Sequence, residues 1–117
     1  MIAKIAGTAT LKSQDGADWF LIHTGTLPDY YITAKDASVA GWNPKFGNLN
    51  LTCPGKMLIG GIYQNRNGHL PTQPGRIWYE ADINYIFGFR GSDRILFSSD
   101  GLVFVTYDHY KTFVEIV

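Results

Sequence analysis

The second half of this chain alternates short apolar runs with turn residues, and that alternation limits the fold more than any other feature. Five runs rich in β-branched and aromatic residues follow Pro54, covering residues 57–63, 77–85, 94–98, 102–106 and 112–116. Turn-forming pairs such as Asn67-Gly68, Pro74-Gly75 and Asp100-Gly101 separate several of them. Apolar runs joined by such tight turns pair as antiparallel neighbours. The sequence therefore predicts an antiparallel sheet of about five strands.

The first half carries helix signals instead. Residues 13–24 favour a helix in which Ser13 is the cap and Gly25 the end. Its expected buried side chains are Trp19, Phe20 and Ile22. A capping box at residues 33–36 predicts a second helix that reaches Gly41, and residues 48–53 favour a third helix of one turn.

Helices followed by strands are typical of an α+β fold. We therefore expect one domain over residues 1–117, with two to three N-terminal helices packed on the C-terminal sheet. Residues 1–12 show no strong periodicity, and we expect them to form a flexible arm.

The arginines are unevenly placed in a chain whose formal net charge is zero. All four lie in the second half: Arg66, Arg76, Arg90 and Arg94. A neutral chain gives no whole-molecule attraction to nucleic acid. A planar guanidinium can grip a phosphate at two points, which lysine cannot do. The distribution therefore predicts a local phosphate pocket and not a long basic track.

The predicted strand at residues 77–85 alternates its side chains between two faces. Glu80 and Asp82 share the face opposite the apolar Tyr79 and Ala81, and Arg94 in the next run can meet them there. This pattern by itself has two interpretations. It indicates a cross-strand ion pair, or it indicates a catalytic carboxylate beside a cation. His109, in a polar segment, is in the same way either a solvated side chain or a proton donor.

A family resemblance favours catalysis. From Leu27 to Val117 the chain resembles the barnase-like, guanyl-preferring ribonucleases of bacteria, the microbial ribonuclease family. The segments that carry it are Leu27-Pro-Asp-Tyr-Tyr-Ile-Thr33, Gly41-Trp42, Pro54-Gly55-Lys56, Asn65-Arg66, Glu80-Ala-Asp-Ile-Asn-Tyr85, Asp93-Arg-Ile-Leu96 and Asp108-His-Tyr110.

The resemblance implies a catalytic role for four residues. Glu80 falls at the general base, His109 at the general acid, and Arg90 and Arg94 at the scissile phosphate. Asp82 falls behind Arg90, which its carboxylate would orient. This set suits RNA cleavage, since a base must deprotonate the 2′-hydroxyl and an acid must protonate the leaving 5′-oxygen. Histidine is suited to the second task because its unperturbed pKa lies near neutrality. No metal or cofactor is implied.

The same resemblance places substrate-binding residues in one loop and one aromatic ring: Gln64, Asn65, Arg66, Asn67 and Tyr110. The loop would read guanine, and Tyr110 would stack on the base. The chain departs from the family where the family has a lysine (Ala34), an aspartate (Gly61) and a glutamate (Asn67). We expect the first two changes to slow cleavage and the third to dilute the preference for guanine, because an amide has one accepting oxygen.

These features imply an endoribonuclease that cleaves single-stranded RNA through a 2′,3′-cyclic phosphate. A toxin domain with a barstar-like inhibitor or immunity protein as partner is also implied. We expect a monomer without membrane contact. The chain shows no signal peptide, and we expect a secreted or delivered domain. Two alternatives stay open: a catalytically silent RNA- or protein-binding module, and a ribonuclease fold acting on another phosphodiester.

Overall fold

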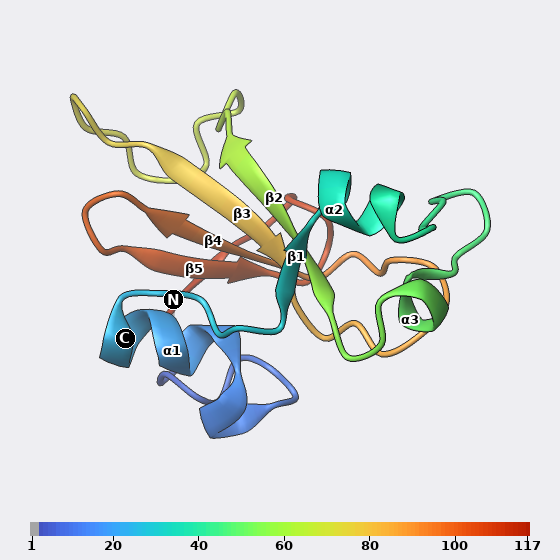
Figure 1. Ribbon diagram of the computed structural model, residues 1–117. Coiled ribbons are helices and arrows are strands. Elements are labelled where there is room, and N and C mark those ends of the chain that lie inside the picture. Colours follow the sequence, from blue (N-terminus) through green and yellow to red (C-terminus); the bar gives the residue numbers. More distant parts are fainter. Residues whose placement is uncertain (1–2) are drawn as a thin grey trace.

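The computed structural model describes residues 3–117, which form a six-stranded sheet flanked by short helices (Figure 1). The strands are neighbours in chain order, from β1 to β6. They are β1 Tyr31–Thr33, β2 Met57–Tyr63, β3 Trp78–Asp82, β4 Arg94–Ser98, β5 Val103–Thr106 and β6 Val114–Glu115. All neighbouring pairs are antiparallel except β1 with β2. The predicted α+β class with a mainly antiparallel sheet is confirmed.

The last strand, β6, covers only two residues of the predicted run 112–116. Two other differences from the predicted sheet have a clear cause. First, β1 was not predicted. It has three residues and pairs in parallel with β2, with Tyr31 opposite Met57, so it has no alternating pattern long enough to find. Second, β3 ends at Asp82 and not at Tyr85, because Asn84 takes a left-handed backbone conformation with φ 62°.

The helical half consists of the 3₁₀ turn η1 (Ser13–Asp15) and the helices α1 (Ala17–Thr24), α2 (Ala34–Val39) and α3 (Leu49–Thr52). The predicted capping box is present, since the Thr33 hydroxyl accepts the Asp36 N–H at 3.1 Å. The cap of α1 is Gly16 and not Ser13. Its buried side is also different from the prediction, because Ile22 is 37% exposed. The residues that α1 buries are Ala17, Asp18 and Leu21.

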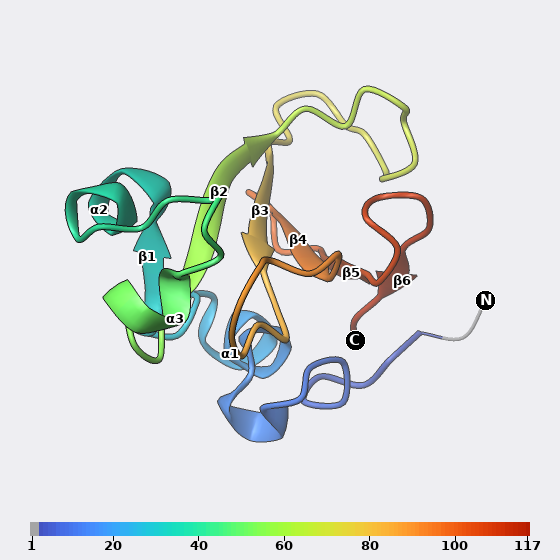
Figure 2. The same cartoon turned by 90° about the vertical axis from the view of Figure 1, so that its right-hand side faces the viewer.

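Residues 3–12, for which we expect a flexible arm, contact the rest of the domain, while residues 1 and 2 lie outside the described part. Lys4 bridges to Ile116, beside the C-terminus. The buried carboxylate of Asp18 accepts the backbone N–H groups of Gly7 and Ala9 at 2.7 and 2.9 Å. These charge-assisted bonds attach the segment to α1. Figure 2 shows the first described residues, in dark blue, on the same side of the molecule as β6 and the C-terminus.

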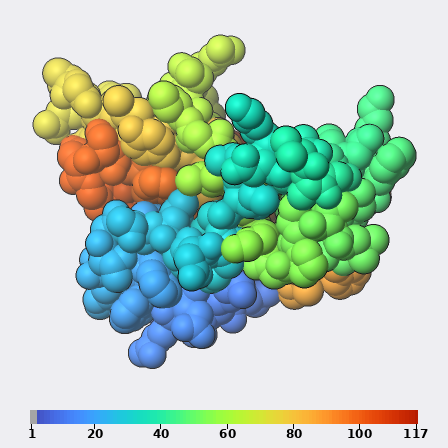
Figure 3. All heavy atoms as spheres, viewed as in Figure 1, coloured from blue at the N-terminus to red at the C-terminus, as the bar shows by residue number. Residues whose placement is uncertain are grey.

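The two faces of the sheet have different partners. One face packs on α1 through an apolar cluster that includes Ala81, Ile95 and Val105. The opposite face carries a second apolar cluster around Trp78 and Leu96. Further along β3 and β4 the same face carries Asp82 and Arg94. Helices α2 and α3 gather at the β1–β2 end (Figures 1 and 3). None of the helices within residues 3–117 is long and apolar enough to cross a membrane.

Candidate active site

A buried carboxylate joins two arginines on the face opposite α1. Asp82 lies directly across from Arg94 in the β3–β4 register. Its carboxylate accepts Nε and Nη2 of Arg90, both at 2.7 Å, and lies 3.1 Å from Nε of Arg94. Asp82 is 2% exposed and Arg94 5% exposed. One carboxylate therefore orients both guanidinium groups, as such forked pairs do with high geometric specificity.

The two arginines differ in how they meet solvent. Arg94 is held further by its Nη1, which donates to the carbonyls of Gly91 and Asp93 at 2.8 and 2.9 Å. The Arg90 side chain is 37% exposed. Its hydrogen bond to Asp82 raises the pKa of the Arg90 guanidinium above its usual value. Arg90 therefore presents a fixed, fully charged donor edge at the surface.

Glu80 stands two residues before Asp82 on the same face of β3, so their Cα atoms lie about 7 Å apart along the strand. The Tyr110 hydroxyl donates a hydrogen bond to Oε1 of Glu80. The Tyr110 ring stacks on Tyr63, with centroids 5.0 Å apart and planes inclined by 10°. Burial, and then the bond to Glu80, raise the pKa of the Tyr110 phenol far above its usual value. The hydroxyl is thus a neutral donor to the carboxylate.

His109 lies at the surface on a loop whose geometry is unusually constrained. Its backbone is left-handed, with φ 54°, and its N–H donates to the carbonyl of Ser92 at 3.2 Å. The imidazole meets the Tyr110 ring edge-on, with centroids 4.9 Å apart. The neighbouring Asp108 accepts bonds from both the hydroxyl and the N–H of Thr112. Those bonds hold the pKa of the Asp108 carboxyl at about 2, so an ionised side chain braces the His109 loop.

The loop after β2 borders a hollow of about 350 Å³ that reaches Glu80. Its lining residues are Ile62, Tyr63, Gln64, Asn65, Arg66, Asn67 and Glu80. Asn65 takes a left-handed backbone, with φ 51°. Its side chain bonds both the N–H and the carbonyl of Leu70, at 3.1 and 2.9 Å. The amide oxygen of Asn67 accepts the His69 N–H at 3.2 Å. Both asparagine side chains therefore hold the loop in shape.

Sequence comparison now identifies the family. Residues 16–117 match the sequence pattern of a ribonuclease family. The chain belongs to the microbial ribonucleases. It is 48% identical to a ribonuclease of Heyndrickxia coagulans over 108 residues, which are 92% of this chain and 99% of that protein. It is equally similar to ribonucleases of Bacillus intermedius and Bacillus pumilus, of which it covers 67%. The match begins before Leu27, where the resemblance was expected to start.

A structural comparison gives a weaker likeness. A crystal structure of ribonuclease Sa2 with guanosine-2′-cyclophosphate is 31% identical, and it aligns with a TM-score of 0.42 over 47% of this chain and 59% of that chain.

The residues predicted for the site of this ribonuclease gather on one face. Glu80, Asp82 and Arg94 come from β3 and β4, while Arg90 and His109 come from the loops beside them. The sequence reasoning missed Tyr63, the ring on which Tyr110 stacks. It also missed Asp108, although an aspartate followed four residues later by a threonine is a local hydrogen-bonding signal. Within residues 3–117 no three His, Cys, Asp or Glu side chains form a group that could hold a metal ion.

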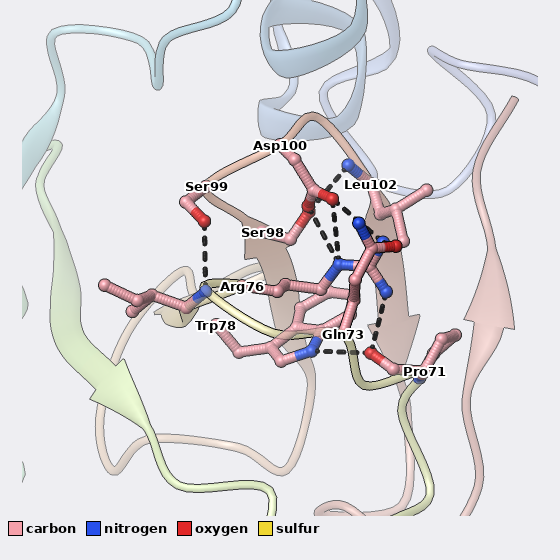
Figure 4. Close-up of polar contacts among 9 residues, drawn as sticks. Pro71, Gln73, Arg76, Trp78, Ser98, Ser99, Asp100 and Leu102 are labelled. Atoms are coloured by element: carbon pink, nitrogen blue, oxygen red, sulfur yellow. Dashed lines mark hydrogen bonds and ion pairs between the residues drawn. The ribbon is translucent and has the colours of Figure 1, made fainter.

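Arg76, the fourth arginine of the second half, lies outside this group. Its guanidinium donates to the Asp100 carboxylate at 2.8 to 3.0 Å and to the Pro71 carbonyl at 3.1 Å (Figure 4). The same carbonyl accepts the indole N–H of Trp78 at 3.1 Å. Arg76 therefore ties the loop before β3 to the β4–β5 turn, and its role is structural.

Two departures from the ribonuclease family pattern can now be located. Ala34 is the first residue of α2, directly after the Thr33 cap. Gly61 lies opposite Glu80 at an irregularity in the β2–β3 register, with φ 86°. A side chain at position 61 must therefore adopt a left-handed backbone, which asparagine and aspartate tolerate better than other residues. The chain thus carries no cation at position 34 and no carboxylate at position 61, the two places where we expect it to differ from the family.

Proposed function

We propose that this protein is an endoribonuclease that cleaves single-stranded RNA, preferentially after guanosine. The observation that carries the proposal is the grouping of Glu80 with the Asp82-linked pair Arg90 and Arg94, beside a hollow large enough for a base. His109 joins the group through Tyr110, whose ring it contacts and whose hydroxyl donates to Glu80. These are the groups that phosphoryl transfer between two oxygens requires: a base, an acid and fixed cations between them.

In the first step the Glu80 carboxylate takes the proton of the ribose 2′-hydroxyl, and the 2′-oxygen bonds to the phosphorus. Arg90 and Arg94 donate to the phosphoryl oxygens, where negative charge grows. The bond from phosphorus to the 5′-oxygen breaks, and His109 gives that oxygen its proton. The products are a 2′,3′-cyclic phosphate and a free 5′-hydroxyl. In the second step the roles of Glu80 and His109 reverse, and water opens the ring.

Tyr110 contributes to the first step through its contact with Glu80, the general base. Its hydroxyl donates to Oε1 of Glu80, and its ring stacks on Tyr63. The remaining oxygen of Glu80 can accept the substrate proton while the tyrosine bond holds the carboxylate in place. Stacking of the guanine base on Tyr110 then requires the ring face that Tyr63 does not cover, or a rotation of Tyr110 away from Tyr63.

Guanine would be read mainly by the backbone of the loop. The N–H groups of Gln64 to Arg66 suit the guanine O6 acceptor, as expected from the family resemblance. Asn67 offers one accepting oxygen, which also serves the His69 N–H, where a carboxylate would offer two. The preference for guanine over adenine is therefore weaker than a carboxylate at position 67 would give. Cleavage of GpN and ApN dinucleotides at equal rates would contradict a guanine preference.

A fluorescent single-stranded RNA with one guanosine tests the reaction, with a chelator present throughout. The expected result is one cut on the 3′ side of that guanosine, ending in a cyclic phosphate. Glu80→Ala and His109→Ala should each lower the rate by roughly 10²- to 10⁴-fold, the usual contribution of acid–base catalysis. Intact RNA that is still bound by the wild-type protein would refute the proposal and favour a silent binding module.

A toxin role for the domain extends the same proposal. A barstar-like inhibitor would place acidic residues over the cationic side of the site, where Arg66, Arg90, Arg94 and His109 lie. Such charge complementarity speeds association and makes it sensitive to salt. Expression of the protein in bacteria with and without a co-expressed acidic inhibitor tests this, and growth unaffected by an active enzyme would argue against it.

A further inference from the structure

Large apolar side chains gather at the surface around α3, and none of them has a role in the proposed reaction. Five residues from two segments, each 67 to 76% exposed, form what we call the loop patch: Phe46, Leu51, Ile86, Phe87 and Phe89. Its three phenylalanines together present roughly 400 Å² to solvent, since one aromatic side chain covers about 150 to 250 Å². A monomeric protein rarely exposes a contiguous apolar patch larger than a few hundred Å² unless a partner binds there.

Contacts between the two segments make the loop patch one surface. A Cβ atom on Gly47 would lie 3.0 Å from the ring of Phe89, so the turn before α3 touches the loop after β3. On α3, the Asn50 side chain accepts the Gly88 N–H at 3.1 Å, and the Asn50 N–H donates to the Tyr85 hydroxyl at 3.2 Å. Figure 1 shows the loop after β3, in orange, passing beside α3. The two segments are therefore held together by their own backbone.

The charge around the loop patch has mainly one sign. Neither residues 37–79 nor residues 83–92, which carry the patch, contain an Asp or a Glu. The basic residues that border it are Lys12, Lys45, Lys56 and Arg90. Arg90 pairs with Asp82, whereas no ion pair within residues 3–117 includes a lysine. The patch therefore has a cationic border, although the formal net charge of the chain is zero.

We propose that the loop patch docks the protein on an anionic lipid surface. The proposal goes beyond the ribonuclease activity and does not depend on it. Exposed apolar side chains enter the boundary between lipid headgroups and acyl chains, and the lysines around them meet the anionic headgroups. This differs from the sequence-based expectation of no membrane contact, and it needs no helix that spans the bilayer.

A second copy of the chain fits the loop patch less well. In a two-fold symmetric contact the same surface of each protomer meets the other. The lysines that border the patch would then lie against the lysines of the partner, and like charges repel. An anionic lipid surface instead supplies the opposite charge around an apolar interior.

Co-sedimentation of the full chain with lipid vesicles, in the absence of RNA, tests the proposal. Vesicles of equal parts phosphatidylcholine and phosphatidylglycerol should bind the wild-type protein, and added salt should weaken the binding. Vesicles of phosphatidylcholine alone should bind it at least roughly tenfold more weakly, because they do not attract the lysines. Phe46→Ser combined with Phe87→Ser should lower the partition coefficient on the mixed vesicles by roughly 10- to 100-fold, since two rings no longer leave water.

Ile5→Ser is the matched control. Ile5 is 69% exposed and follows a lysine, but it lies beside β6, where Lys4 bridges to Ile116. This variant should bind the mixed vesicles like the wild type. Leu51→Gln changes the patch on α3 instead of the loops and should also lower the partition coefficient. Urea unfolding of each variant establishes that it is folded before its binding is compared.

Several results would overturn the proposal. They are a wild-type protein that does not bind the mixed vesicles, equal binding to both kinds of vesicle, undiminished binding by folded patch variants, and an equal loss in Ile5→Ser. Sedimentation equilibrium without lipid examines the other occupant. A concentration-dependent dimer that is abolished by Phe46→Ser combined with Phe87→Ser would assign the loop patch to a second copy of the chain and refute the lipid surface.

Discussion

The narrow space between β2 and Glu80 leads to a sharp prediction for Gly60→Ala. A Cβ atom at position 60 would lie 2.7 Å from Cγ and 3.2 Å from the carboxyl carbon of Glu80. The backbone of Gly60 is outside the left-handed region, unlike that of Gly61. Alanine therefore fits the local conformation, and the contact with Glu80 is the perturbation. Because the two nearest atoms belong to the Glu80 side chain, that side chain can shift, whereas backbone atoms could not.

The size of the effect follows from that distance. Carbon atoms in ordinary contact lie about 3.5 to 4.0 Å apart, so Glu80 must shift by roughly 1 Å. A misplacement of this size costs a catalytic group on the order of 10²-fold in rate, or about 2.7 kcal/mol of transition-state stabilisation. Crowding of a packed site typically costs about 1 to 3 kcal/mol of folding free energy, and the lower end is expected here because the Glu80 side chain can yield.

Single-turnover cleavage of the one-guanosine RNA measures the rate, and urea unfolding measures the stability. Gly91→Ala is the matched control: its backbone is also outside the left-handed region, and no heavy atom beyond its chain neighbours lies within 4 Å of a Cβ built there. It should retain wild-type activity. A folded Gly60→Ala protein that cleaves RNA within threefold of the wild type would refute the reasoning that Gly60 holds Glu80 in position.

Three further predictions concern charge. Asp82→Asn leaves two guanidiniums, one of them buried, without their carboxylate, and it should cost about 3 to 5 kcal/mol of unfolding free energy in urea titrations; a loss below 1 kcal/mol would contradict this. Arg76 and the Ser98 hydroxyl lower the pKa of Asp100 to about 2, below the unfolded value, so the pair stabilises the fold above about pH 4 and loses its effect as pH falls toward 2. Asp100→Asn should therefore lower the melting temperature at pH 6, and its difference from the wild type should shrink between pH 4 and pH 2; a constant difference would exclude the pair as its source. Ala34→Lys combined with Gly61→Asp should raise the cleavage rate by roughly tenfold by supplying a cation to the transition state, and an unchanged rate would show that the absent pair does not limit the enzyme.

Local sequence patterns predicted much of the fold and the face of β3 that carries Glu80 and Asp82. The ends of β2 and β4 match the expected runs, and the capping box at Thr33 opens α2 as expected. The alternation of β3 correctly separated Glu80 and Asp82 from the apolar face. Each of these features depends on residues within a few positions of one another, where backbone geometry sets the direction of a side chain.

Other features could not be found in this way, because they join residues far apart in the chain. The carboxylate of Asp18 attaches the N-terminal segment through bonds to backbone N–H groups, and any residue type could supply those. β1 has only three residues and exists because the edge of β2 is available to it. The contacts of Asn65 and Asn67 join residues that are near in the chain, but they depend on the folded path of the loop, in which Asn65 takes a left-handed backbone.

The sequence by itself determined the fold class, the family, and which face of β3 would carry charge. Strand periodicity and turn chemistry are local, and the family pattern extends over most of the chain. Only the tertiary structure decided that Tyr110 would donate to Glu80 while stacked on Tyr63, and that one buried Asp82 would hold both arginines. Those contacts depend on the register and twist of neighbouring strands and on the path of two loops, which set distances that no local pattern encodes.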